Sequence, residues 1–192
     1  MPRDSDATKA RLLDAAFSEF AAHGIAGARV DRIAEAANAN KRLIYVYFGN
    51  KEQLFDTVLE RAFTLGAEAV PFDAENLPDY AGKVFDHLIA RPDLARLLTW
   101  KQLERPGATE LEASAYRVKT AAVAQAQDQA LIDDNLDPAD LLALVLALAQ
   151  AWFTVAGGMG PSGTDNPWAT HQLARHRAAV VHAVRRITTP GG

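Results

Sequence analysis

Apolar residues recur every three or four positions along most of the chain, which is the spacing that gives an α-helix one apolar face. No stretch alternates apolar and polar residues in the way that predicts a β-strand. We therefore predict an all-α fold. The predicted helices cover residues 5–23, 31–37, 41–48, 51–69, 80–90, 92–104, 109–133, 138–158 and 167–187.

Several of the longer helices show an apolar stripe from which an inner face can be predicted. In helix 5–23 the stripe is Leu13, Phe17 and Phe20, and Gly24 ends the helix as a C-terminal cap. Residues 71–79 hold two prolines and three acidic residues, which indicates a linker. The stripe predicted for helix 109–133 consists of Leu111, Ala115, Val118, Ala122, Ala126 and Leu131.

The two short helices, 31–37 and 41–48, are separated by a break of three residues that contains two asparagines. Asn38 tolerates the left-handed conformation that often ends a helix. Asn40 can cap the following helix by accepting a hydrogen bond on its side-chain oxygen. The pattern therefore predicts two helices joined by a tight turn.

Two cations stand at the start of helix 41–48, where positive charge opposes the helix macrodipole. Lys41 and Arg42 gain nothing there unless an external anion, such as a phosphate, or a guanine edge is their partner. Ile44 and Phe48 are predicted to be buried, which leaves the cations on the outward surface. This arrangement is typical of a helix-turn-helix reader of the DNA major groove, while the helical pattern alone fits an ordinary hairpin with a solvated face equally well.

The residues of this stretch also follow a known pattern, K-x-x-L-Y-x-x-F-x-x-K, which is matched by Lys41, Ile44, Tyr45, Phe48 and Lys51. On these residues the segment resembles the DNA-binding domain of the TetR family of bacterial transcriptional regulators. The resemblance runs in register from residue 7 to residue 60, about the first third of the chain. The rest of the chain matches the family much more weakly.

Four positions depart from the family pattern. Asn38 stands at the turn position that is usually glycine, and Arg29 stands where a threonine or serine usually caps the first helix of the pair. Arg42 and Leu43 replace the small residue and the threonine that usually follow the lysine. These changes leave the predicted fold intact, but the base preference cannot be transferred from the family.

The resemblance implies a helix-turn-helix DNA-binding domain over residues 1–50 and a helical effector-binding and dimerisation domain over residues 51–192. It further implies a homodimer that binds a roughly palindromic site in double-stranded DNA and represses transcription until a small-molecule effector binds. The candidates for contacts with base edges are Lys41, Arg42 and Tyr45. The candidates for contacts with phosphates are Arg29, Arg32, Tyr47, Asn50 and Lys51.

The distribution of charge fits a DNA-binding head, residues 1–51, followed by an acidic body, residues 52–192. Residues 1–51 hold eight Lys or Arg and six Asp or Glu, a net charge of +2, and residues 52–192 hold twelve and eighteen, a net charge of -6, in agreement with -4 for the chain. Such a weakly basic head needs a few well-placed contacts, and two heads acting together, to bind DNA. The chain has no cysteine and its N-terminus is unlike an export signal, so we expect a cytoplasmic protein.

The most apolar stretch, from Leu141 to Gly158, reaches the lower limit of about 18 residues for a membrane span. Gln150 interrupts it and no basic residues flank it, so we expect no membrane insertion. A helix that is apolar all round must be buried on all sides, and a second chain is the simplest cover. Residues 157–163 are expected to form a loop before the last helix, which would complete a four-helix dimerisation bundle in the resemblance. The residues expected to form the dimer are Leu141, Leu144, Leu148, Val180 and Val184.

The sequence offers no chemistry that indicates an enzyme. No phosphate-binding glycine loop follows a predicted strand, and no serine lies in a nucleophile motif. His171 and His176 are five residues apart, not the three or four that would place them on one helical face, and neither has an acidic residue beside it. We therefore expect no catalytic residue, no metal site and no cofactor, although an enzyme is kept as a third possibility.

The body contains several aromatic residues on neighbouring predicted helices. Aromatic residues at helical spacing usually fill a core, which is one interpretation of this set. In the other interpretation, which rests on the resemblance, some of them line an effector pocket together with a few polar residues. The candidates are Phe63, Phe85, His87, Trp100, Tyr116, Gln150, Trp152 and Phe153. A helical ligand-binding or scaffolding protein that does not bind DNA is the alternative function.

Overall fold

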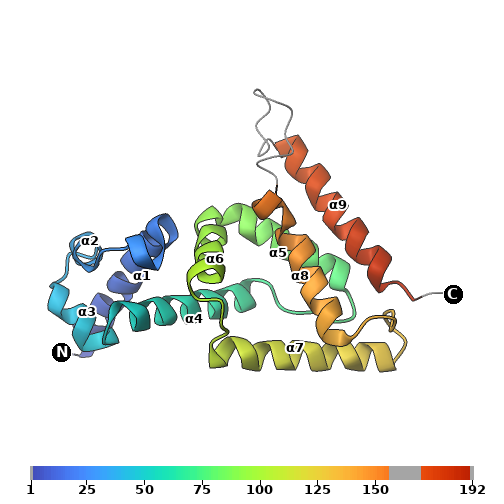
Figure 1. Cartoon of the computed structure of the whole chain (residues 1–192), viewed down its shortest axis with the longest axis horizontal. Helices are drawn as coiled ribbons and strands as arrows, with labels where there is room; N and C mark the ends of the chain where they lie inside the picture. The colour runs from blue at the N-terminus through green and yellow to red at the C-terminus, as the bar shows by residue number, and fades with distance from the viewer. Residues whose placement is uncertain (1, 156–169, 191–192) are drawn as a thin grey trace. The chain divides into compact units, whose positions relative to one another are not determined.

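The computed structural model describes residues 2–155 and 170–190, and within these residues it consists of nine α-helices and no β-strand (Figure 1). The all-α prediction is therefore confirmed. The expected loop 157–163, the end of the eighth helix at Gly158 and the start of the last helix at Pro167 lie outside the described residues. The helices are α1 (Pro2–Gly27), α2 (Val30–Ala36), α3 (Lys41–Phe48), α4 (Lys51–Ala69), α5 (Leu77–Ala90), α6 (Pro92–Glu104), α7 (Glu110–Asp128), α8 (Pro138–Val155) and α9 (Thr170–Thr188).

The chain divides into two compact units. The first contains Met1–Leu65 and Arg91–Glu112, and the second contains Gly66–Ala90 and Ala113–Gly192. The first unit is larger than the predicted domain 1–50 because it includes most of α4 and the whole of α6.

The core of the first unit is built from α1, α2, α3, α4 and α6. Phe20 of α1 and Phe55 of α4 meet edge to face with ring centroids 5.0 Å apart, and Leu97 of α6 is fully buried in the same cluster. The stripe predicted for α1 is right at Phe20, which is fully buried, but its other two positions are one residue out of phase, since Leu12 and Ala16 are fully buried instead. The predicted Leu13 and Phe17 pack at the edge of this core. A helical repeat of 3.6 residues allows both stripes, and only the contacts with the other helices decide between them.

The helical segment predicted to end at Gly24 does end there, and a short second segment continues to Gly27 across a kink that is formed by Gly24. Its φ of 66° and ψ of -174° lie outside the helical region and suit glycine. A Cβ atom on Gly24 would lie 2.8 Å from the Trp100 ring. The Glu104 carboxylate accepts hydrogen bonds from the backbone N–H groups of Ile25, at 2.6 Å, and Ala26, at 3.3 Å. The last two turns of α6 therefore hold the kinked end of α1.

The second unit is formed by α5, α8 and α9 with most of α7 and the end of α4. The stripe predicted for α7 is right at Ala126, which is buried, but Leu111, Val118 and Leu131 are exposed, and the fully buried Val123 lies outside the predicted stripe. The predicted helix 109–133 is also too long, because α7 ends at Asp128 and Ala130 takes a positive φ of 56°. The many alanines of this helix carry little phase information, since they fit either a buried or an exposed face.

In α8 only one face is buried by the chain itself. Leu141, Leu142, Val145 and Ala149 are buried, whereas Leu144 keeps 44% of its surface exposed. Among the described residues, none of the helices combines the length and the apolar character that crossing a membrane requires.

Candidate nucleic-acid interface

The turn between α2 and α3 is built by the two asparagines, as predicted. Asn38 adopts a left-handed conformation with a φ of 47°. The side-chain oxygen of Asn40 accepts a hydrogen bond of 2.8 Å from the backbone N–H of Arg42, which caps α3. Arg29 begins α2 without a side-chain cap, and its backbone N–H donates to the Glu19 carboxylate at 2.8 Å instead.

The eight residues of α3 are divided into a buried and an exposed face. Ile44 is fully buried and Phe48 is 7% exposed, so both anchor the helix in the core of the first unit. On the other side Tyr45 is 47% exposed and Val46 is 63% exposed, and Arg42 is exposed as well. This outward face is available to a partner.

The cations predicted to contact DNA differ in their surroundings. Lys41 forms an ion pair of 2.8 Å with Asp31, and the hydrogen bond to that carboxylate raises the pKa of Lys41. The Lys51 ammonium donates to the carbonyl of Ala28 at 3.3 Å. Among the described residues no acidic side chain pairs with Arg42, whose guanidinium stays on the surface. Arg42 is therefore the cation of α3 that can bind an external anion without first breaking an ion pair.

Arg32 braces α2 against α1. Its guanidinium bonds to the Glu19 carboxylate and donates to the carbonyl of Gly27 at 2.9 Å. Burial by itself would raise the pKa of Glu19, but the hydrogen bonds from Arg32 and from the Arg29 backbone hold that pKa below its ordinary value. Glu19 therefore stays ionised, and its carboxylate holds the start of α2 in place.

Tyr47 and Asn50 have structural partners in addition to their predicted role. The Ser5 hydroxyl donates to the Tyr47 hydroxyl at 3.2 Å, which ties α3 to the beginning of α1. The Asn50 side chain accepts from the backbone N–H of Gln53 at 2.8 Å and so caps α4, as the sequence predicts. Both residues therefore help to hold α3 and the start of α4 in place.

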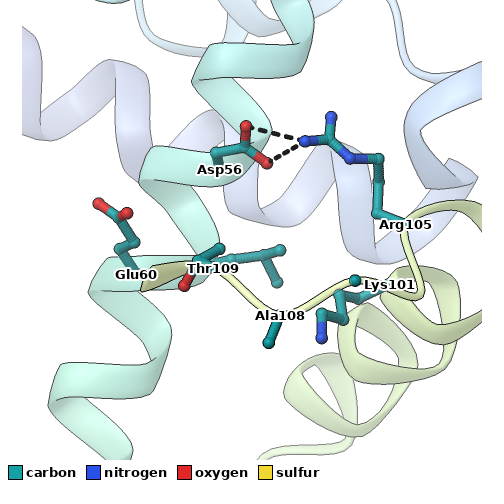
Figure 2. Close-up of a pocket in the computed structure, with 8 residues that line it drawn as sticks. Asp56, Glu60, Lys101, Arg105, Ala108 and Thr109 are labelled. Atoms are coloured by element: carbon teal, nitrogen blue, oxygen red, sulfur yellow. Dashed lines mark hydrogen bonds and ion pairs between the residues drawn. The ribbon is translucent and has the colours of Figure 1, made fainter. Parts of the chain in front are cut away.

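A polar pocket of about 280 Å³ lies in the first unit, between α4, the end of α6 and the loop that leads to α7 (Figure 2). Arg105 reaches across it to Asp56 at 3.0 Å. Lys101 is almost fully buried and pairs with Glu112 at 3.3 Å, while the same carboxylate accepts from the Thr109 N–H and caps α7. The carboxylate of Asp56 and the guanidinium of Arg105 point toward each other, and their ion pair joins α4 to the end of α6. None of the predicted effector residues lines this pocket.

The predicted effector residues are divided between the two units. Phe63 and Trp100 belong to the first unit, where Trp100 packs against the kink of α1. In the second unit Phe85 of α5 and Phe153 of α8 are in ring contact, with centroids 6.0 Å apart. His87 and Gln150 are half-buried, and Tyr116 is exposed. The Gln150 amide donates to the carbonyl of Leu146 within its own helix.

Trp152 stacks on His176 of α9, a residue for which no role is predicted from the sequence. The Trp152 indole nitrogen and the His176 Nε2 are buried without a hydrogen-bond partner among the described residues. Burial lowers the pKa of His176, as does the nearby charge of Arg175. This pair is detectable only in three dimensions, because the two residues come from different helices.

The residues predicted for dimerisation also fall into two groups. Leu141 and Val184 are fully buried by their own chain, so they serve its core and are not available to a second chain. Leu144 is exposed, and Leu148 and Val180 are half-buried. These three remain the predicted contact residues.

A capped turn, a short anchored helix and an exposed face with an unpaired arginine define the class of protein: a helix-turn-helix regulator that binds DNA. Residues 12–58 match the family model described as bacterial regulatory proteins, tetR family. Residues 76–186 match the model described as the tetracyclin repressor-like C-terminal domain. The chain belongs to the TetR family of bacterial transcriptional regulators.

Individual relatives agree with this assignment. The chain is similar to the HTH-type transcriptional repressor SCO4008 of Streptomyces coelicolor, with 44% identity over 175 residues that cover 85% of this chain and 90% of the relative. Among solved structures, the transcriptional regulator SCO4942 of Streptomyces coelicolor superimposes with a TM-score of 0.80 and 41% identity, covering 94% of this chain and 98% of that chain. A TetR family regulator of Pseudomonas syringae, at 21% identity and a TM-score of 0.65 over 94% of this chain and 96% of that chain, shares the fold.

Proposed function

We propose that this regulator is a homodimeric repressor, which binds a roughly palindromic operator through α3 and leaves it when a small molecule binds the second unit. The observation that carries the proposal is the outward face of α3, where Arg42 and Tyr45 stand exposed over the buried anchors Ile44 and Phe48. Arg42, Lys41 and Tyr45 contact base edges in this proposal. The phosphate contacts come from Arg29, Arg32, Tyr47, Asn50 and Lys51.

A dimer is supported by the apolar side chains that the chain leaves on the outer face of α8. Leu144 and Leu148 lie one helical turn apart, and Val180 of α9 is half-buried. Two heads related by a two-fold axis would enter successive major grooves about 34 to 36 Å apart. Doubling the head also supplies the affinity that its small net charge cannot. The similarity to the repressor SCO4008 supports repression, and DNA as the partner supports a cytoplasmic location.

An effector site in the second unit is supported by the aromatic groups of α5, α8 and α9, and the proposal narrows to five of the predicted residues. They are Phe85, His87, Gln150, Trp152 and Phe153. An effector can release the operator only to the extent that it binds the released conformation more tightly than the DNA-bound one.

The proposal is tested by selecting bound fragments from genomic DNA and measuring their affinity at several salt concentrations. We expect binding to a few fragments that contain an inverted repeat, with an affinity that falls steeply as salt rises, because phosphate contacts release counterions. Equal binding to all fragments, or binding that salt leaves unchanged, would contradict it.

A further inference from the structure

Val46 is the most exposed apolar side chain of α3, and its own chain gives it no core to pack against. It keeps 63% of its surface exposed, against 7% or less for the anchors Ile44 and Phe48. Valine is also a weak helix former, because its branched side chain loses rotational freedom in a helix. Neither burial nor helix propensity therefore explains a valine at this position.

Val46 shares the outward face of α3 with Arg42. The two residues are four positions apart, which places them on the same side of the helix, one turn from each other. A partner that covers the exposed Arg42 guanidinium therefore also covers Val46 and removes its surface from water. A single exposed valine needs no explanation elsewhere on the molecule, but this one lies on the face of α3 that is proposed to contact DNA.

The major groove offers one apolar group to such a side chain, the C5-methyl group of thymine. We propose that Val46 reads a thymine through this methyl group and is a specificity-determining residue of α3. The inference rests on the proposed function. Four helical residues rise about 6 Å, which is about two base-pair steps of 3.4 Å. The thymine should therefore lie within about two base pairs of the base that Arg42 contacts.

The test replaces single thymines of the selected operator with deoxyuridine, which lacks only the methyl group, and measures dissociation constants by fluorescence anisotropy. For the unchanged protein we expect a loss of about fourfold when the critical thymine is replaced in one half-site and about fifteenfold when it is replaced in both, which corresponds to the burial of one methyl group per half-site. For Val46→Ala the same replacements should change the affinity by less than about twofold. Val118→Ala is the matched control, since Val118 is a 68% exposed valine on α7 and its removal should leave the deoxyuridine effect in place.

Two results would overturn the inference while leaving the proposed function intact: an unchanged protein that tolerates deoxyuridine throughout each half-site, or a Val46→Ala protein that still discriminates against it. Sequence-independent binding by the unchanged protein would instead contradict the proposed function itself. Alanine is a better helix former than valine, so Val46→Ala should fold, which circular dichroism verifies.

Discussion

Arg42 is the residue on which the proposed recognition of DNA depends most. Its guanidinium is exposed, and the carboxylate of Asp31 on the neighbouring helix is already paired with Lys41. The Asn40 side chain caps the helix through the Arg42 backbone and so fixes the point from which this side chain extends. Recognition by Arg42 therefore requires no loss of an internal contact.

Replacing Arg42 with alanine should weaken binding to the preferred operator by about 1 to 3 kcal/mol, because a bidentate contact with a guanine is lost. The loss should be smaller for unrelated DNA, so the sequence preference should also become weaker. Arg96→Ala, which removes an exposed arginine of α6, is the control for a general loss of charge. Anisotropy titrations with the operator and with a scrambled duplex measure both effects. An equal loss on the two duplexes would mean that Arg42 contacts a phosphate.

Glu19 should make the first unit sensitive to acid. Its folded pKa is held below the ordinary value by Arg32 and Arg29, so its contribution to stability is present above the ordinary carboxyl pKa and is lost as the pH falls through the folded value. Glu19→Gln should cost about 1 to 2 kcal/mol at neutral pH and little at pH 3. Thermal unfolding between pH 3 and pH 7 measures the difference. A variant that is equally destabilised at both ends of this range would show that the charge of Glu19 is unimportant.

Among the elements, α6 belongs to the first unit, which contains α2 and α3, and not to the second unit. Leu97 lies in the core of the first unit, Trp100 packs against Gly24 and Glu104 binds the backbone at the end of α1. The ion pair of Arg105 with Asp56 adds a contact with α4 across the polar pocket (Figure 2). A change in the position of α6 would therefore act directly on α1 and α4, the helices that carry α2 and α3.

Two glycines provide a direct test of the packing between α1 and α6. Gly24→Ala should destabilise the protein by more than about 1 kcal/mol, because the positive φ disfavours alanine and its Cβ would lie 2.8 Å from Trp100. Gly66→Ala should stabilise it by about 0.5 to 1 kcal/mol, since Gly66 lies in helix α4 and nothing lies within 4 Å of an added Cβ. Urea unfolding compares the two variants. A neutral Gly24→Ala would contradict the proposed role of the kink.

The sequence-based predictions are accurate where a feature depends on residues close together in the chain, and they fail where it depends on residues far apart. The turn at Asn38, the cap at Asn40 and the limits of α3 were predictable because they depend on residues only two to four positions apart. The place of Leu97 in the first unit was not, because it depends on contacts between residues far apart in the chain. The pairing of Lys41 with Asp31 was missed for the same reason, as it crosses the turn between two helices.

Which residues of a helix are buried is also hard to predict from the sequence alone. Alanine-rich helices such as α7 present apolar residues on several faces, so several phases fit equally well. In α1 the difference between Leu12 and Leu13 is settled only by what packs against the helix. The residues on the outward face of α3 could be predicted from the helical repeat, but the exposure of Val46 and the absence of an ion pair at Arg42 became apparent only in the structure.

At the scale of the whole molecule, DNA binding in this account depends on a second copy of the chain. The side chains that would join the copies lie on α8 and α9, whereas those that read the operator lie on α3. The acidic body contributes no attraction to phosphate, so a single weakly basic head should bind the operator poorly.

Replacing both Leu144 and Leu148 with glutamate should convert the dimer to a monomer, because each dimer would then bury four carboxylates in an apolar interface. Sedimentation velocity measures the mass, and the same sample should lose operator binding while its helix content is unchanged. Val118→Glu, at an exposed valine of α7, should remain dimeric. If the double variant still sediments as a dimer, α8 is not the interface.

Methylation protection of the selected operator tests most directly whether two α3 helices enter the major groove, since dimethyl sulfate modifies guanine N7 there. Two protected groups of guanines, related by the inverted repeat and about one helical turn apart, are expected, and Arg42→Ala should remove a protected guanine from each group. Binding that leaves every guanine N7 reactive, or that protects a single group, would contradict the account of two α3 helices in successive major grooves.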